Sequence, residues 1–165
     1  MPRAGFYAVE SGKISFRRDG RWYNDDEVIA NPRIALLFSR SIRRNPDGGY
    51  LLQVADERAP ITVEDTPYVV TDVDRDGHRA FVIVTNDQVR EPLDPSTLEV
   101  GDANVLYCRV KQGEFRARFL RNAYYALADH FVTDDGENFA LVIDRQRYPI
   151  RLAAGPKPAA DAKSR

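Results

Sequence analysis

The feature that most constrains the fold is an order of elements, hairpin, helix and hairpin, that the sequence patterns predict twice. Residues 105–152 repeat the order found in residues 13–63, with Ile150 lying 89 positions after Ile61. Identities between the two segments are few, so a chance resemblance of two amphipathic helices with hairpins is the alternative. Each half alone, at about 75 to 80 residues, would have a thin core. We therefore expect the two halves to pack on each other.

In the first half, strand-forming segments on both sides of Gly20 predict a hairpin, because glycine readily adopts the positive φ of a tight turn. Asn31 is a good N-cap and Pro32 suits the first helical position. Apolar spacing then predicts an amphipathic helix that continues through Ile42 and carries two arginines in its last turn. Residues 50–63 read as a second hairpin.

In the second half, strand-forming segments on both sides of Gly113 again predict a hairpin. A helix capped by Asn122 follows, with apolar residues on one face through Phe131, and residues 139–152 match the second hairpin of the first half. The predicted fold class is therefore α+β, with an internal duplication of a hairpin-helix-hairpin unit.

The segments outside the two copies suggest the domain boundaries. Residues 68–73 and 79–85 alternate as strands, and the polar stretch that follows them contains two prolines. The end of the chain has no large apolar residue with which to offset the entropy of ordering. The predicted organisation is a first copy with added middle strands at 1–85, a linker or long loop at 86–101, a second copy at 102–152 and a disordered tail at 153–165.

The composition is that of an ordinary globular protein with no excess charge of one sign. The chain has 24 basic and 25 acidic side chains, whereas proteins that neutralise many nucleic-acid phosphates usually carry a basic excess. We therefore expect no duplex nucleic acid as a partner. No apolar run is long enough to span a membrane, no signal peptide is visible, and a single cysteine excludes an intrachain disulfide. These features predict a cytoplasmic protein with no membrane association, and they leave the oligomeric state open.

No catalytic motif is visible, so we expect no enzyme activity, no metal and no cofactor. Residues 72–77 reproduce the start of a calcium loop, but Ile83 stands where the twelfth position needs glutamate, which favours a hairpin turn. His78 and His130 are interpreted as surface or packing residues rather than catalytic bases. Cys108 lies in an apolar strand and is interpreted as a buried thiol. No glycine-rich phosphate loop links a strand to a helix.

A basic, aromatic strand in the second half is the best candidate for a binding site. Its alternation places the aromatic residues inward and Arg116 and Arg118 on the opposite face, with Arg121 beside the N-terminus of the second helix. Such guanidinium groups suit a phosphate or carboxylate, and a solvated strand face is the alternative. The acidic counterpart is Glu64 with Asp65. This pair either forms ion pairs that hold the halves together or lines a cleft for a small ligand.

Several short motifs together indicate a family. They are ISFRRDGRWY at residues 14–23, LF at 37–38 before RRNPDG at 43–48, ITVEDTPY at 61–68, TN at 85–86 and ARFLRNAYY at 117–125. On these motifs the chain resembles the bacterial family called domain of unknown function 1285 over most of its folded length. It departs from the family pattern at Asn122, where proline is expected, and at residues 55–57, where a Thr-Pro-like start to the turn is expected.

The resemblance implies a duplicated α+β core, a second half similar to a pleckstrin-homology barrel, a ligand site between the halves, nucleotide-type ligands, a signalling role and no enzyme activity. We therefore expect a non-catalytic protein that senses a small anionic or nucleotide-like ligand between its halves. Its expected ligand-binding residues are Glu64, Asp65, Tyr68, Arg116, Arg118, Arg121 and Tyr125. The alternative is a protein-protein docking module with no small-molecule ligand, in which Trp22, Tyr124 and Tyr125 would serve as anchors.

Overall fold

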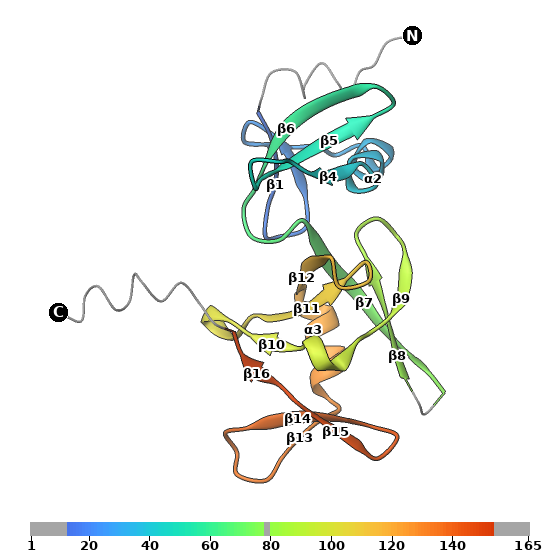
Figure 1. Cartoon of the computed structure of the whole chain (residues 1–165), viewed down its shortest axis with the longest axis vertical. Helices are drawn as coiled ribbons and strands as arrows, with labels where there is room; N and C mark the ends of the chain where they lie inside the picture. The colour runs from blue at the N-terminus through green and yellow to red at the C-terminus, as the bar shows by residue number, and fades with distance from the viewer. Residues whose placement is uncertain (1–12, 78–79, 154–165) are drawn as a thin grey trace, which may run out of the picture.

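The computed structural model describes residues 13–77 and 80–153, which form two adjoining bodies built mainly of β-strands (Figure 1). One body contains residues 13–63 and the other contains residues 68–153. Mixed sheets with few helices agree with an α+β class that is mostly β. His78, Arg79 and the predicted tail beyond Ala153 lie outside the described residues.

The first body is a six-stranded sheet with one α-helix, α2, at Pro32–Ser39. The spatial order of its strands is β3-β2-β1-β6-β5-β4, in which β1 and β6 are parallel and all other neighbours are antiparallel. The strands are β1 (Ile14–Phe16), β2 (Trp22–Asn24), β3 (Glu27–Val28), β4 (Ile42–Arg44), β5 (Tyr50–Val54) and β6 (Glu57–Val63).

Three aromatic side chains fill the core between this sheet and α2. The ring of Trp22 lies 4.8 Å from that of Phe16 and 5.5 Å from that of Phe38, and all three are at most 1% exposed. The indole nitrogen of Trp22 donates a hydrogen bond to the Ser39 hydroxyl at 2.9 Å, so its polar atom is satisfied inside the protein. Trp22 is therefore a core residue, and its expected role as a docking anchor is wrong.

The helix α2 begins as predicted and ends earlier than predicted. The Asn31 side chain accepts a hydrogen bond from the Arg33 backbone at 2.9 Å, as expected of an N-cap. The helix ends at Ser39, and Ile42 begins strand β4, in register with Leu52 of β5. Ile42 is buried in β4. An apolar residue at this position fits a buried strand as well as it fits the helical spacing, so the spacing extended the predicted helix too far.

The second body contains a seven-stranded sheet, a three-stranded sheet, the α-helix α3 at Arg121–Ala128 and two short 3₁₀ helices, η1 (Pro95–Thr97) and η2 (Asp102–Asn104). The seven strands have the order β16-β10-β11-β12-β7-β8-β9, with β16 parallel to β10 and β12 parallel to β7. They are β7 (Tyr68–Asp76), β8 (Ala80–Thr85), β9 (Arg90–Pro92), β10 (Glu99–Val100), β11 (Leu106–Val110), β12 (Phe115–Phe119) and β16 (Arg151–Leu152). The small sheet contains β13 (Phe131–Thr133), β14 (Phe139–Ile143) and β15 (Gln146–Pro149). Neither described α-helix has the length and apolar character to cross a bilayer.

Three details of this body differ from the prediction. The N-cap of α3 is Leu120 rather than Asn122, since the Tyr124 backbone already donates to the Leu120 carbonyl at 2.8 Å. Phe131 does not extend the helix; it opens β13 opposite Leu141. Residues 86–101, expected to be a linker or long loop, contain β9, η1 and β10. These strands have only two or three residues, too few to give a periodic signal.

Both bodies use a similar pairing scheme, with counterparts that differ from those predicted. In each, three successive antiparallel strands (β1-β2-β3 and β10-β11-β12) precede a helix and a three-stranded meander. In the first body the last strand of the meander, β6, is parallel to β1, whereas in the second a separate strand after the meander, β16, is parallel to β10. Both helices have eight residues. The Gly20 turn joins the first two strands of this scheme and the Gly113 turn joins the last two, so these turns are not equivalent in it. An internal duplication stays a prediction.

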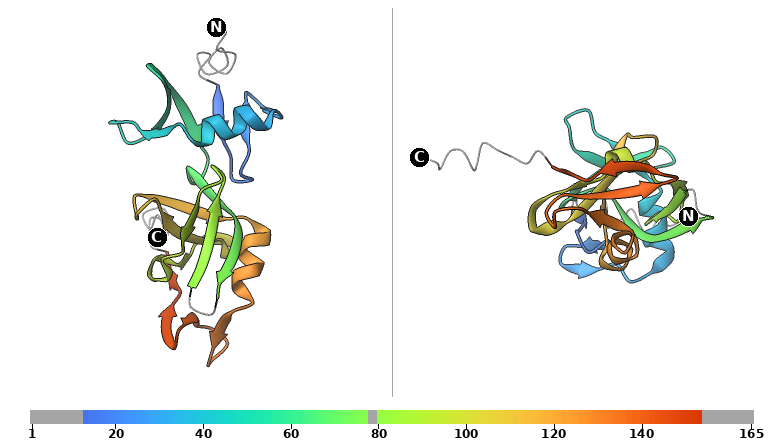
Figure 2. Two further views of the ribbon diagram at one scale, coloured as in Figure 1. Left: turned by 90° about the vertical axis from the view of Figure 1, so that its right-hand side faces the viewer. Right: turned by 90° about the horizontal axis from the view of Figure 1, so that it is seen from below.

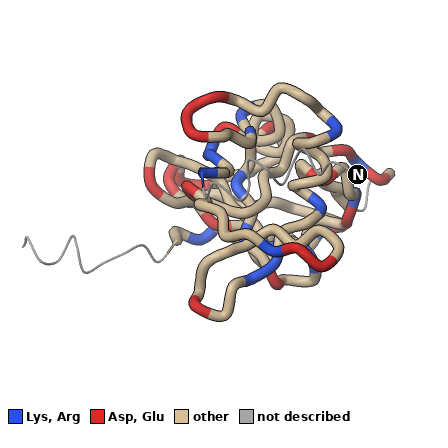
Figure 3. Tube along the Cα trace, turned by 90° about the horizontal axis from the view of Figure 1, so that it is seen from above, with Lys and Arg blue, Asp and Glu red and all other residues tan. Residues whose placement is uncertain are grey.

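The two bodies meet end to end (Figure 2), and their contact combines apolar packing with polar contacts. The Asn86 side-chain amide donates to the Ser39 hydroxyl at 2.8 Å, and the Arg40 guanidinium donates to the Asp87 carbonyl at 3.2 Å. Among the described residues five polar side chains are buried, and four of them lie at this junction: Ser39, Thr66, Thr85 and Asp87. Seen along the long axis, acidic and basic residues are interspersed around the molecule (Figure 3).

Candidate functional site

The carboxylate of Asp65 and the guanidinium of Arg118, both on the predicted list, meet at the junction. Asp65 Oδ2 lies 2.8 Å from Arg118 Nη1 and accepts a hydrogen bond from the Tyr107 hydroxyl, also at 2.8 Å. Both charged side chains are about four-fifths buried. Burial, together with the hydrogen bond to Asp65, raises the pKa of Tyr107. This pair joins the link between the bodies to β12, as the structural interpretation of the acidic pair predicted.

Arg116 lies beside that pair, over the Tyr107 ring, but three other predicted residues, Glu64, Arg121 and Tyr125, do not converge on it. Glu64 turns toward Arg18, accepting a hydrogen bond from its backbone at 2.8 Å and forming an ion pair with its guanidinium at 3.4 Å. Arg121, at the start of α3, is exposed, and within the described chain its side chain forms no hydrogen bond or ion pair. Tyr125 is 58% exposed and packs against Tyr124. The seven predicted residues therefore do not form a single cluster.

Tyr68 lies in a polar network that the sequence did not reveal. Its ring is buried, and the Lys111 ammonium lies 4.9 Å from the ring centre. Burial, with a smaller contribution from the nearby Asp87 carboxylate, raises the pKa of Tyr68 to about 12. Lys111 Nζ forms an ion pair with Asp87 at 2.6 Å, and the Thr85 hydroxyl donates to the same carboxylate at 2.5 Å. This network connects the turn between β11 and β12 to the junction.

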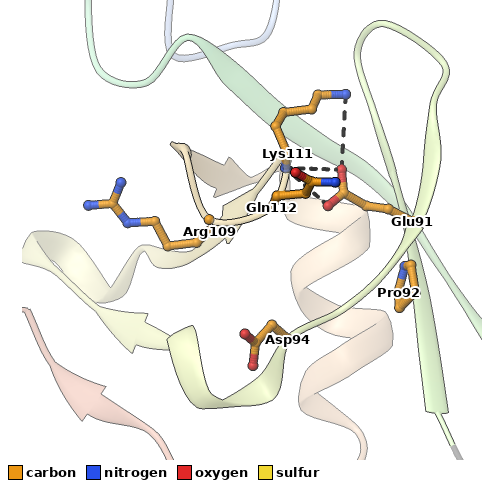
Figure 4. Close-up of a pocket in the computed structure, with 7 residues that line it drawn as sticks. Glu91, Pro92, Asp94, Arg109, Lys111 and Gln112 are labelled. Atoms are coloured by element: carbon orange, nitrogen blue, oxygen red, sulfur yellow. Dashed lines mark hydrogen bonds and ion pairs between the residues drawn. The ribbon is translucent and has the colours of Figure 1, made fainter.

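A hollow of about 540 Å³ opens beside this network (Figure 4). It is lined by Glu91, Pro92, Asp94, Arg109, Lys111, Gln112 and Gly113. Glu91 comes from β9 and accepts hydrogen bonds from the Lys111 backbone at 3.1 and 3.3 Å, which holds the two walls together. Figure 4 shows the Arg109 side chain pointing away from Glu91 and Lys111, on the far side of the turn.

A second hollow, of about 120 Å³, lies on the outer face of β10, β11 and β12. It is lined by Thr97, Glu99, Cys108, Arg109, Arg116 and Arg151. Arg116, one of the predicted residues, forms two hydrogen bonds to Glu99 and lies 3.7 Å above the ring of Tyr107. Arg109 borders both hollows. No sequence pattern distinguishes Arg109 or Arg151 from the other arginines, because only the strand pairing brings them beside Arg116.

The groups available for covalent chemistry are poorly placed for it. Cys108 is 1% exposed, and burial raises the pKa of its thiol, which keeps the sulfur protonated. His130 packs its ring against Phe81 at 5.0 Å, and its Nδ1 lies 3.1 Å from the Arg75 guanidinium. In residues 13–77 and 80–153 no three His, Cys, Asp or Glu side chains are grouped to hold a metal ion. The carboxylates of residues 72–76 lie in β7, which pairs with β8 as an antiparallel hairpin, so the turn predicted at these residues begins later in the chain.

Comparison with known proteins supports the family suggested by the motifs. A family model described as "Domain of unknown function (DUF1285), N-terminal domain" matches residues 8–66. A solved DUF1285 family protein from Silicibacter pomeroyi DSS-3 is similar at a TM-score of 0.66 and 22% sequence identity, with 84% of this chain and 79% of that chain covered. Another, from Shewanella baltica OS155, is similar at a TM-score of 0.58 and 20% identity, with 71% of this chain and 91% of that chain covered. No curated protein gives a significant match. Residues 8–66 of this chain match the model of the N-terminal domain of the DUF1285 family, and two solved DUF1285 family proteins share its fold over most of its length.

Proposed function

We propose that this protein is a non-catalytic sensor of a small anionic or nucleotide-like ligand, acting in cytoplasmic signal transduction and binding its ligand where the two halves adjoin. The observation that carries the proposal is the 540 Å³ hollow of the second body, whose wall includes Lys111, the residue that pairs with Asp87 at the junction. Its volume lies in the range of roughly 300–1,000 Å³ that is usual for small-molecule sites. Its charged lining consists of two basic and two acidic side chains, so a ligand anion would have to compete with the carboxylates for Arg109 and Lys111.

Lys111 connects this hollow with the junction between the two bodies. The ammonium that borders the hollow is the one that pairs with Asp87, and the Asp87 carbonyl accepts a hydrogen bond from Arg40 at the end of α2. A ligand anion that draws the ammonium away from Asp87 changes the balance of charge between the halves. A ligand can shift the arrangement of two bodies only through such differential contacts.

Some of the residues at the site hold the halves together, and others have donors available to a ligand. Asp65 and Arg118 already form an ion pair with each other and are mostly buried, so we assign them the role of holding the halves together. Arg109 differs, because its exposed side chain forms no hydrogen bond or ion pair within the described residues. The free donors that a ligand anion needs are therefore at Arg109, beside the predicted Arg116, rather than at Arg118.

Thermal unfolding in the presence of nucleotides and small dicarboxylates tests the proposal. A ligand that binds only the folded state raises the midpoint in a concentration-dependent way. We expect at least one compound to do so with the wild type, and Arg109→Gln to lose most of the shift. Arg33→Gln, which removes an exposed arginine on α2, is the matched control and should keep the shift. If no compound acts at millimolar concentration, or if both variants respond alike, the proposal fails.

A protein-protein docking module is the second candidate, favoured by one observation. Tyr125 is 58% exposed on α3 and stacks edge-on against Tyr124, which makes a rigid aromatic surface. Binding of a purified partner that Tyr125→Ala abolishes, with no small-molecule response, would favour this function over ligand sensing.

We also propose that the two halves are copies of one ancestral unit. The support is the similar pairing scheme and the spacing, since α2 begins at Pro32 and α3 begins 89 positions later at Arg121. The likeness of the second half to a pleckstrin-homology barrel, which the family resemblance implies, stays a prediction.

A further inference from the structure

We infer that the small hollow on the outer face of β10, β11 and β12 binds a phosphate group, held by Arg109, Arg116 and Arg151. The inference rests on the proposed function in one respect, namely that the phosphate belongs to the ligand of the larger hollow, because Arg109 borders both. The inference adds a ligand class and an anchoring site to that function.

The strand register brings two arginines together without a shared counter-ion. Arg109 of β11 lies directly opposite Arg116 of β12, and like charges in such cross-strand pairs are destabilising. Arg116 has Glu99 as its partner, whereas Arg109 has none among the described residues. The Arg109 side chain also points away from Glu91 and Lys111, which could have neutralised or repelled it (Figure 4). An anion between the two guanidinium groups removes their repulsion.

Unlike Arg109, both Arg116 and Arg151 are held in place by hydrogen bonds within the protein. Arg116 donates from Nε and Nη2 to a single oxygen of Glu99, at 3.2 and 3.0 Å, while its plane lies over the Tyr107 ring. Arg151 donates from Nη2 to the Ser96 carbonyl at 2.6 Å. Each guanidinium has five N–H donors, so both keep donors for a ligand after these bonds are made. Their orientation therefore costs little additional entropy when an anion binds.

Charge and size both match a phosphate. The three arginines and Glu99 leave an excess of two positive charges around the hollow, the charge that a doubly ionised phosphate neutralises. At about 120 Å³, the hollow is suited to a small group such as phosphate rather than to a whole nucleotide. Guanidinium groups bind phosphate through paired N–H donors, a geometry that lysine does not reproduce.

Titration of the protein with inorganic phosphate, followed by NMR of the arginine Nε–H groups, tests the site. We expect saturable shifts at Arg109, Arg116 and Arg151, and at least tenfold weaker binding in Arg151→Gln and in Arg116→Lys. Arg33→Gln is the control and should bind phosphate as the wild type does. Acetate at equal ionic strength separates a phosphate site from a general carboxylate site. Equal affinity for acetate, shifts spread over all arginines, or unchanged binding in Arg151→Gln would overturn the inference.

A second comparison separates this inference from the proposed function. A nucleoside monophosphate, the matching nucleoside and inorganic phosphate are each titrated into the wild type, Arg109→Gln and Arg151→Gln. If phosphate binding depends on these arginines, and the nucleoside monophosphate binds no more tightly than inorganic phosphate, the result supports the phosphate site and counts against the larger ligand. A ligand whose binding depends on Arg109 and is unchanged in Arg151→Gln supports the proposed function and overturns the phosphate site.

Discussion

Replacing Gly20 with alanine tests how closely the two halves are packed. Gly20 has a φ of +81°, a conformation that costs an L-residue about 1–2 kcal/mol. An added Cβ would also lie 3.0 Å from Val69 Cγ2 and 3.2 Å from Leu120 Cδ1, across the junction. Val69 is 1% exposed and has no free space to move into, and overpacking of this kind costs about 1–3 kcal/mol. We expect Gly20→Ala to lower the free energy of unfolding by about 2–5 kcal/mol.

Gly113 supplies the matched control. Its φ is +82°, and a Cβ there would meet nothing within 4 Å. Gly113→Ala should therefore show the backbone cost alone, about 1–2 kcal/mol. Equilibrium unfolding in urea, measured for both variants and the wild type, gives the contact contribution as the difference between them. Equal losses would refute the reasoning, because they would mean that the Gly20 turn is not held tightly against Val69 and Leu120.

Two further substitutions test the buried network at the junction. Lys111→Met keeps the aliphatic stem but leaves the buried Asp87 carboxylate without its cation, so we expect a loss of about 2–4 kcal/mol in urea unfolding. Lys13→Met, at the exposed pair with Asp25, should cost less than about 1 kcal/mol, and comparable losses would contradict the prediction. The raised pKa of Tyr68 means that the folded state holds the phenolic proton more tightly than the unfolded chain, so the free energy of unfolding should fall as the pH rises from 10 toward 12, by about 1.4 kcal/mol per pH unit. Tyr68→Phe should make this fall shallower, and an unchanged slope would show that another group causes it.

The parts of the fold that local chemistry determines were predictable from the sequence. The first helix could be located because Asn31 and Pro32 act within their own turn. Its end could not, because Ile42 satisfies both a helical spacing and a buried strand position, and only pairing with β5 decides between them. Strands β9 and β10 were missed for a related reason, since a two- or three-residue strand exists only through its partners.

The candidate site was predictable only where opposite charges stand out in the sequence. The acidic pair and the basic strand predicted an ion pair between Glu64 or Asp65 and Arg118 or Arg121, and the fold selects Asp65 with Arg118. Lys111 and Asp87 could not, since they lie in segments that read as a turn and a linker and are joined only by the tertiary fold. The pairing of Arg109 with Arg116 depends on strand register, which no local pattern specifies.

The parallel pairing of β7 with β12 has a consequence for how the chain folds. Val69 lies opposite Arg118, so the two strands are separated by nearly fifty positions, whereas the other edge of β7 pairs with the adjacent strand β8. The β7-β8 hairpin can therefore form early, while the other edge of β7 remains unpaired until β12 adds to it. An unpaired edge is where one chain can join to another. Aggregation of newly made or partly unfolded protein should accordingly begin at Tyr68–Val70, and substitutions that slow the closing of β12 should increase it.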